Sequence, residues 1–514
     1  MDNDLKRQKK RNDLCVLKKI CIVSLLSLSF IVGQAKDNSI PQKEEVGACA
    51  MPLAIAPVAN APFEVASFGR PVFPALTISI VDKGARENKP ITKIVNKTID
   101  EVSKKGGGTV VIPVGKWQSA RIVLKSNVNL HLAKGAEVTF SDKSEDYLPA
   151  VFTRHEGIEV MAPGAFIYAN GQENIAITGQ GCLYGPSLDS PIRKKTIAEV
   201  VVENVVAADT PLKERIFDGM NGRRLYVPKT ISPINCKNVL IEGLTLNRSL
   251  FWNICPIYCE QVIIRGMTVN SVGVPSGDGI DIESCKDVLI EYCTMNNGDD
   301  CFTLKAGRGD DGLRVGKPSE NIVIRHSLAQ NGHGAITCGS ETAGGIKNVY
   351  AYDCVFDSTE RGIRFKTRRS RGGGVESIFY ERIRMIGVKE AFTWDLLGSQ
   401  RYVGDLAKRY PPRDIDRLTP VVKDIHVKDF IVESSQFFIR ANCIPEIPLN
   451  NVLLENGEVN CNTIIGAMDD VTGFVLRNLN VNAKNSAMKI LDGEDVVFDN
   501  VKFSVQDEEK SKQQ

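Results

Sequence analysis

Short segments in which apolar and polar residues alternate recur along most of the chain. Residues 238–246, with the sequence Asn-Val-Leu-Ile-Glu-Gly-Leu-Thr-Leu, are one example. Each segment opens with Asn, Asp, Gln, Ser or Gly and continues with β-branched or apolar residues interleaved with polar ones. Such alternation is typical of a half-buried strand, and helical spacing is absent from these segments. The pattern therefore predicts many short strands.

The spacing of the segments predicts how these strands are arranged. The segments begin at Asn238, Gln261, Asp287, Asn321, Asn348, Ser377, Asp424, Asn451, Gly473 and Asp495. A base period near 22 residues, with occasional longer loops, is typical of a solenoid. Because one strand cannot bury its apolar face alone, stacking of successive coils completes the core. The sequence predicts an all-β fold, a right-handed parallel β-helix, since the Leu-x-x-Leu-x-Leu pattern of leucine-rich repeats is missing.

The sequence before and between the repeats predicts a cap and several loops. Residues 92–104 have amphipathic helical spacing and are followed by three glycines, so we expect a short N-terminal helix that caps the open end of the apolar stack. The first strands are expected at 109–113, 122–125, 128–132 and 137–140. The period is interrupted by polar, Gly-, Pro- and Arg-rich sequence at 183–230, 306–319 and 397–421. Long loops on a rigid scaffold often build a site.

The N-terminus predicts export. Basic residues from Lys6 to Arg11 precede an apolar run at 20–32 and a small-residue site at Gly33-Gln34-Ala35. This order predicts a secretory signal that is too short for a comfortable membrane span, with a retained anchor as the alternative. A weak likeness to a lipidation box ends at Cys49. We expect an exported monomer, periplasmic or extracellular, with no stable membrane span after signal removal.

The chain is expected to divide into four parts. These are a signal peptide at 1–35, an N-terminal extension at 36–75, a parallel β-helix catalytic domain at 76–505 and a polar C-terminal tail at 506–514. A chain of 514 residues, 43% hydrophobic and 25% charged, can bury a large core.

Charge and cysteine usage narrow the possible partners. A formal net charge of +2 gives no electrostatic case for nucleic-acid binding, so an acidic ligand must be held by a local basic cluster. The 14 cysteines show neither CxxC pairs nor Cys/His zinc spacing. Several fall at similar places in successive repeats, which predicts interior thiols and leaves a disulfide or two open.

Charged residues between positions 278 and 366 form a candidate site. They are Asp278, Asp299, Asp300, His333, Arg364 and Lys366. Neighbouring coils lie about 4.8 Å apart, so the spacing of 21 residues between the first two aspartates predicts that they stack. The Arg-x-Lys pair lies on one face of a strand, and the histidine comes from the intervening coil. We expect all six side chains to converge.

This combination of charges suits hydrolysis of an acidic polysaccharide. Three carboxylates within a few ångströms cannot all stay ionised cheaply, so the pKa of at least one should rise and supply a proton for a glycosidic oxygen. The other carboxylates can activate water on the opposite face of the sugar. The cations would pair with a sugar carboxylate.

The same residues resemble a known family. Asp278-Gly279, Asp299-Asp300, Gly332-His333-Gly334 and Arg364-Phe365-Lys366 look like the four signature motifs of the polygalacturonase family, glycoside hydrolase family 28. The resemblance covers most of the chain after the signal. It implies a right-handed parallel β-helix and inverting hydrolysis of α-galacturonosyl linkages in pectic polysaccharide or oligogalacturonides, without a metal or another cofactor.

The resemblance also implies roles for the acids. Asp299 corresponds to the general acid, and Asp278 with Asp300 corresponds to the pair that holds the attacking water. His333 would tune or orient the acid.

The cationic motif and two departures complete the resemblance. Arg364 and Lys366 would bind the galacturonate carboxylate at the cleavage subsite. Ser276-Gly277 stands where the family usually has Asn-Thr, which leaves the preferred galacturonan open, and Phe365 replaces the usual Ile. Action on a rhamnogalacturonan or a substituted galacturonan is therefore an alternative.

Further alternatives stay open at this point. Exo-action is favoured if the loop at 307–317 walls off one end of the site. A Ca-dependent pectate lyase and a non-catalytic carbohydrate-binding solenoid are other functions for a parallel β-helix. Trp252 is either a sugar platform or a buried aromatic. Substrate contact and solvent exposure are both possible for Arg368, Arg369 and Arg371.

Overall fold

The computed structural model describes residues 39–194 and 202–506. The described residues from Ile40 onward form one compact unit, and the predicted signal peptide lies outside the described residues. Among the residues described, no helix is long and apolar enough to cross a membrane. The proposed division of the chain into four parts stays a prediction.

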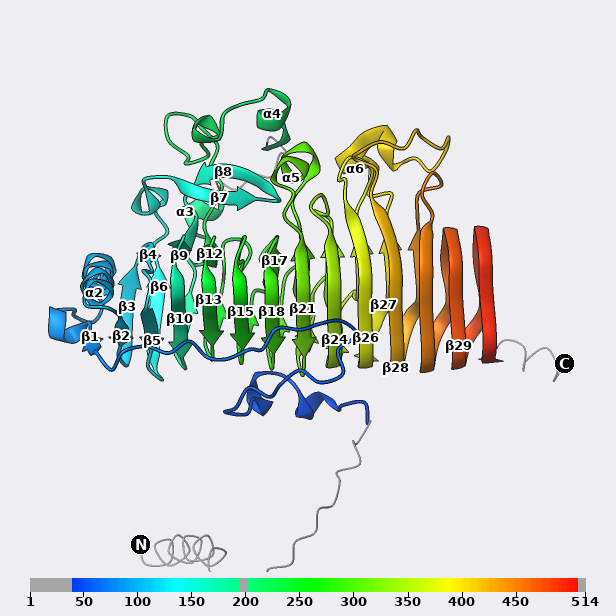
Figure 1. Cartoon of the computed structure of the whole chain (residues 1–514), viewed down its shortest axis with the longest axis horizontal. Coiled ribbons are helices and arrows are strands. Elements are labelled where there is room, and N and C mark those ends of the chain that lie inside the picture. The colour runs from blue at the N-terminus through cyan, green and yellow to red at the C-terminus, as the bar shows by residue number, and fades with distance from the viewer. Residues whose placement is uncertain (1–38, 195–201, 507–514) are drawn as a thin grey trace, which may run out of the picture. The chain divides into compact units, whose positions relative to one another are not determined.

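The unit is a right-handed parallel β-helix, as predicted (Figure 1). Its strands stack in three columns. The first column contains β2 (Gly108–Ile112), β5 (Val128–Leu132), β10 (Glu173–Gly179), β13 (Lys237–Glu242), β15 (Glu260–Arg265), β18 (Lys286–Glu291) and β21 (Ser319–Arg325). The second contains β3 (Gly115–Ser119), β6 (Ala136–Phe140), β11 (Cys182–Tyr184), β14 (Thr245–Asn247), β16 (Thr268–Asn270), β19 (Thr294–Asn296) and β22 (Leu328–Gln330).

The third column carries the candidate site. It contains β4 (Ile122–Val123), β9 (Ala165–Asn170), β12 (Lys229–Ile234), β17 (Ile280–Glu283), β20 (Phe302–Lys305), β23 (Ile336–Gly339), β25 (Arg361–Lys366) and β27 (Val388–Asp395). Longer strands complete the later coils, namely β24 (Ile346–Asp357), β26 (Gly374–Ile386), β28 (Val421–Asn442) and β29 (Leu449–Val505). Alternate side chains of each strand point inward and form one continuous apolar core.

Helix α2 (Thr92–Lys104) closes the N-terminal end of this core, which confirms the expected cap. Its buried face is formed by Val95, Thr98, Ile99 and Val102. The helix contacts β2, β4 and β5 and lies at the β1 (Thr77–Ser79) end of the stack in Figure 1.

The residues that open the repeats hold a left-handed backbone turn. Asn238, Asn321 and Asn348 have φ angles of 55°, 57° and 54°. Asparagine tolerates this conformation better than most residues. The side chains also form a ladder, in which Asn348 Nδ2 donates to Asn321 Oδ1 at 3.0 Å and Asn321 Nδ2 donates to Asp287 Oδ1 at 3.1 Å. These opening residues therefore hold the turn and connect successive coils.

Ten of the twelve cysteines in the part of the chain that the structure describes are buried, and all twelve are free thiols. The backbone N–H of Cys236 donates to Cys259 Sγ at 3.4 Å, and that of Cys259 donates to Cys285 Sγ at 3.3 Å. These thiols stack through the core, which confirms the prediction of interior cysteines.

Several inserted elements gather at one edge of the stack in Figure 1. They are the antiparallel hairpin β7 (Val151–His155) and β8 (Ile158–Ala162), with α3 (Pro191–Lys194), α4 (Val202–Ala207), α5 (Gly309–Val315) and α6 (Gln400–Val403). They come from the predicted loops and from the turn between β6 and β9.

Candidate active site

Three aspartates lie where the chain enters the third column. Asp278 precedes β17, and Asp299 and Asp300 precede β20. One carboxylate oxygen from each aspartate lies within 4.8 Å of the others. The structure therefore brings the three predicted acids together.

The register differs by one residue from the expected stacking. Ile280 pairs with Phe302, and the N–H of Gly279 donates to the carbonyl oxygen of Asp300. The coil is 22 residues long here, so Asp278 stacks on Asp300 and the expected stacking on Asp299 is wrong. Asp299 instead occupies the turn before the strand. That position lets its side chain lie toward the next coil.

Asp300 is fully buried between two cations. Its Oδ1 accepts a hydrogen bond from Arg364 Nη1 at 3.0 Å, and its Oδ2 accepts one from Lys366 Nζ at 2.6 Å. Burial alone would raise the pKa of Asp300, but Lys366 and Arg364 outweigh burial and hold the pKa below its usual range. Asp300 is therefore ionised near neutral pH.

Glycine at position 334 makes this ion cluster possible. A Cβ atom there would lie 2.8 Å from Asp300 Oδ1 and 3.2 Å from Arg364 Cδ. Any larger residue would displace the carboxylate from its cation.

Asp299 pairs with His333. The ring Nδ1 of His333 lies 3.1 Å from Asp299 Oδ1, and the backbone N–H of His333 donates to the carbonyl oxygen of Asp299 at 3.0 Å. The hydrogen bond that His333 donates to Asp299 raises the pKa of His333. Burial pushes the pKa of Asp299 upward, but the hydrogen bond from His333, together with the charges of Lys366 and His333, outweighs burial and lowers that pKa. In the free site the shared proton is therefore mainly on His333.

Asp278 is the acid whose pKa rises. Burial is the main cause, and the neighbouring carboxylates Asp281 and Asp299 add to it. This rise confirms that the crowded carboxylates cannot all stay ionised. The pKa that rises is that of Asp278, however, and not that of Asp299, which the resemblance identifies as the general acid.

Sequence reasoning missed a buried charged group beneath these acids. Lys305 Nζ lies 3.2 Å from Glu341 Oε2, 3.7 Å from Asp281 Oδ1 and 4.0 Å from Asp278 Oδ2. Burial is the main factor that raises the pKa of Asp281, to about 8. Asp281 alternates with the core residues Ile280 and Ile282, as any solvent-facing residue would. Trp252 and Glu341 lie against Lys305 on this outer face, and no local pattern in the sequence indicates that the face is buried.

The acid cluster is a group whose oxygens are close enough together to hold a metal ion. Both oxygens of Asp300 are already bound by Lys366 and Arg364, and Lys305 lies beside Asp278. Cationic side chains thus already compensate the charge that would attract a divalent ion.

Two open alternatives are settled by burial. Trp252 is 4% exposed, and Lys305 Nζ lies 4.6 Å from its ring centroid, so Trp252 is a buried aromatic. Arg369 is also buried and pairs with Glu446, with Nε 2.5 Å from Oε1. Arg369 therefore has a structural role.

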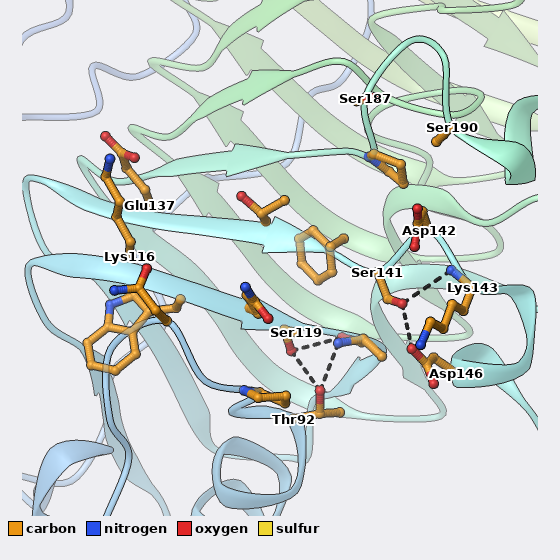
Figure 2. Close-up of a pocket in the computed structure, with 18 of the residues that line it drawn as sticks. Thr92, Lys116, Ser119, Glu137, Ser141, Asp142, Lys143, Asp146, Ser187 and Ser190 are labelled. Carbon is orange, nitrogen blue, oxygen red and sulfur yellow. Dashed lines mark hydrogen bonds between the residues drawn. The ribbon is translucent and has the colours of Figure 1, made fainter.

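A pocket of about 1250 Å³ lies elsewhere along the second column (Figure 2). It is lined by the ends of β3 and β6, the start of α2 and residues 186–191, and by none of the six predicted site residues. Two coil steps, from β11 through β14 to β16, separate its nearest wall at residues 186–191 from the turn that carries Asp278. That distance is roughly 10 Å along the axis. This pocket therefore lies apart from the acid cluster.

Ion pairs join the inserted elements into one wall. Arg314 Nη2 lies 2.5 Å from Glu159 Oε2 of β8, and Arg215 Nη1 lies 2.8 Å from Asp311 Oδ1 of α5. The tip of the hairpin is tied to the same loop, because Arg308 Nη1 lies 2.9 Å from Glu156 Oε2.

Comparisons with known proteins agree with this geometry. Residues 217–396 match the model of glycosyl hydrolases family 28. The chain is 34% identical over 319 residues to an endo-polygalacturonase of Pectobacterium carotovorum subsp. carotovorum, covering 60% of this chain and 72% of that protein. This chain belongs to glycosyl hydrolase family 28. It is therefore a glycoside hydrolase, as the four motifs predicted.

Two further relatives extend the match over most of the chain. A crystal structure of a hyperthermoactive exopolygalacturonase from Thermotoga maritima is 30% identical, with a TM-score of 0.72, and covers 85% of this chain and 94% of that one. A probable polygalacturonase of Vitis vinifera is 29% identical over 382 residues, or 71% of this chain and 70% of that protein.

Proposed function

We propose that this family 28 enzyme hydrolyses α-galacturonosyl linkages in pectic polysaccharide or oligogalacturonides. The observation that carries the proposal is the meeting of Asp278, Asp299 and Asp300 within 4.8 Å, directly beside Arg364 and Lys366. Acids that transfer protons and cations that hold a uronate carboxylate are thereby combined in one site. The relatives named polygalacturonase support the same substrate class.

Asp299 donates the proton in this proposal. It shares one proton with His333 across a 3.1 Å contact. A bound sugar would exclude water from the pair and favour its neutral form, with the proton on Asp299. That proton passes to the glycosidic oxygen as the bond to the anomeric carbon breaks. His333 then receives a proton from solvent and restores the pair.

Asp300 and Asp278 position the water. Asp300 is ionised and accepts the proton that the attacking water loses, while protonated Asp278 can hydrogen-bond the same water. The two catalytic carboxyl groups of inverting enzymes are commonly about 6.5–9.5 Å apart. The nearest carboxylate oxygens of the three aspartates are closer, within 4.8 Å of one another. NMR of the first-formed product anomer tests inversion directly, and a retained α-anomer would contradict it.

We further propose exo-action, which rests on the wall of inserted elements. The ion pairs between Arg308 and Glu156 and between Arg314 and Glu159 hold that wall beside the site. A closed end would admit only a chain terminus. Polygalacturonate should therefore lose viscosity slowly while short products of one size appear from the start. Rapid loss of viscosity with mixed oligomers would indicate endo-action.

A rhamnogalacturonan or substituted galacturonan is the second candidate substrate, because the first motif departs from the family. A Cβ atom at Gly277 would lie 2.8 Å from the carbonyl oxygen of Val274, so the packing excludes a threonine here. Incubation with homogalacturonan, rhamnogalacturonan and defined oligomers, followed by product sizing, separates these substrates. Ultraviolet absorbance of unsaturated products and inhibition by a chelator would indicate a lyase.

Export to the periplasm or the exterior, and action as a monomer, complete the proposal. Pectic substrates lie outside the cell, which supports export. The N-terminal sequence of the secreted protein, together with its mass in solution, tests both statements.

A further inference from the structure

Three arginines gather at the far ends of the site strands. Arg308 follows β20, and Arg368 and Arg371 follow β25, whereas the aspartates precede their strands. Arg308 is 5% exposed and Arg371 is 2% exposed. We call these three residues the arginine cluster.

The cluster has more donors than partners. Nε of Arg308, Arg368 and Arg371 is buried without a hydrogen-bond partner. The side chain of Arg371 makes one hydrogen bond, from Nη1 to Glu203 Oε1 at 3.3 Å, although a guanidinium offers five N–H donors. Unmatched donors on a buried cation are costly, so their retention indicates an anionic ligand.

Repulsion among the three arginines also indicates an anionic ligand. Burial is the main factor that lowers the pKa of Arg371, and the charges of Arg308 and Arg368 add to this effect, so that the pKa falls to about 9. The buried anion nearby, Glu341, is already bound to Lys305 at 3.2 Å. Among the residues that the structure describes, Glu156 pairs with Arg308 at 2.9 Å and Glu341 is held by Lys305, which leaves the three arginines short of negative charge.

Glu203 of α4 partly fills this deficit. Its Oε1 lies 2.5 Å from Arg308 Nη2 and 3.3 Å from Arg371 Nη1. The Glu203 side chain is 47% exposed, so it can turn into solvent without any movement of the backbone. A carboxylate that two buried arginines share, and that can leave, marks where a ligand carboxylate would bind.

We propose that the arginine cluster is a second carboxylate-binding site, which Glu203 occupies in the free enzyme and a second uronate of the substrate occupies during turnover. The inference rests on the proposed function, because it assigns the ligand as part of the same substrate. Guanidinium groups match carboxylates in bidentate geometry. The charges of Arg371 and Arg308 act on Glu341, which lies 3.2 Å from Lys305, and Lys305 in turn lies 4.0 Å from Asp278.

The experiment compares substrates with one and with several uronates. Values of kcat/KM are measured for 4-nitrophenyl α-galacturonide and for trigalacturonate, in wild type, Arg368→Gln and Glu203→Gln. Arg368 is the least buried of the three arginines, so its replacement leaves no large cavity. Arg417→Gln is the matched control, because Arg417 is 67% exposed and pairs with Asp310. Melting temperatures verify that each variant is folded.

The two variants should act in opposite directions. Arg368→Gln should lower the ratio of kcat/KM for trigalacturonate to that for the aryl substrate by on the order of tenfold, since a charge-assisted hydrogen bond is lost. Glu203→Gln should raise this ratio about threefold, because the ligand no longer displaces a carboxylate. The control ratio should match wild type.

A purely structural cluster would behave differently. If both variants lower the ratio, or if neither changes it, the inference is overturned. Inorganic sulfate should inhibit trigalacturonate hydrolysis more strongly than hydrolysis of the aryl substrate, and equal inhibition would also count against the site. Failure of the wild type to hydrolyse either substrate would instead contradict the proposed function.

Discussion

Polar side chains stack between successive coils in two regions of the molecule. One is the asparagine ladder, formed by Asn348, Asn321 and Asp287, and the other is the catalytic turn, which carries Asp278, Asp299 and Asp300. In the ladder, Asn348, Asn321 and Asp287 repeat nearly the same side chain in successive coils, and each amide donates to the next oxygen. In the catalytic turn, Asp278 and Asp300 stack instead, and two carboxylates cannot hydrogen-bond each other unless one is protonated. Identical stacking is therefore favourable for amides and costly for acids.

The catalytic turn offsets this cost with unlike neighbours. Lys366 and Arg364 compensate Asp300, His333 compensates Asp299, and Asp278 keeps its proton. The difference between the two turns shows that the coil repeats its backbone while its side chains need not repeat. Reactive groups arise where the repeat of side chains is broken.

The largest expected effect is loss of the proton donor. Asp299→Asn should leave the fold intact and reduce kcat on oligogalacturonides by about 10³-fold or more. Asp287→Asn is the matched control, because an amide at position 287 can still accept from Asn321. A dinitrophenyl galacturonide, whose leaving group needs no proton, should recover most activity in Asp299→Asn. If Asp278→Asn is recovered in this way and Asp299→Asn is not, Asp278 is the donor.

Removing a cation from the turn should chiefly weaken binding. Arg364→Ala should raise KM by about tenfold or more, since a bidentate carboxylate contact is lost. It should also raise the pKa of Asp300, whose charge would be less compensated. Steady-state kinetics measure the effect. The control variant is Arg477→Ala, because Arg477 is exposed and pairs with Asp499. An unchanged KM would remove Arg364 from substrate binding.

Breaking the ladder should affect stability and not catalysis. Asn321→Ala loses two ladder hydrogen bonds and places alanine at a φ of 57°, so the free energy of unfolding should fall by about 2 kcal/mol. Asn321→Gly relieves the backbone cost and isolates the hydrogen bonds. Urea unfolding measures both variants, and a large fall in kcat would show that the two turns are coupled.

The smallest expected effect is a shift in the pH profile. The pKa of His333 is raised by Asp299, so wild-type activity should fall as the pH rises through this raised pKa and the pair loses its proton. In His333→Gln the proton can reside only on Asp299, and the basic limb of kcat/KM should move to lower pH. A basic limb that stays in place would show that another group controls it.

Much of the fold followed from local signals, whereas the site followed only in part. The opening residues such as Asn321 mark the start of each coil, because few other residues tolerate the turn. The register was harder to predict. Asp278 and Asp299 are 21 residues apart, but the hydrogen-bonded coil contains 22 residues, so the two aspartates are offset by one residue in the turn. The acids nevertheless meet Arg364 and Lys366 as predicted, because side chains are long enough to span an offset of one residue.

Lys305, Asp281 and the arginine cluster could not be found in this way. Asp281 has the alternation of a surface residue, and Arg308 lies in a polar loop. Their burial depends on elements distant in sequence, such as the hairpin carrying Glu156 and the helix carrying Glu203. Only the folded arrangement shows which charged residues are covered.

The insertion between β20 and β21 separates two tasks within one coil. Residues 306–318 leave and return without altering the pairing of Leu289 with Val323 on the back of the solenoid. This insertion therefore leaves the strand pairing behind the site unchanged. Exchange of this insertion between related enzymes would offer a route to new sugar preferences without any change in the residues that break the bond.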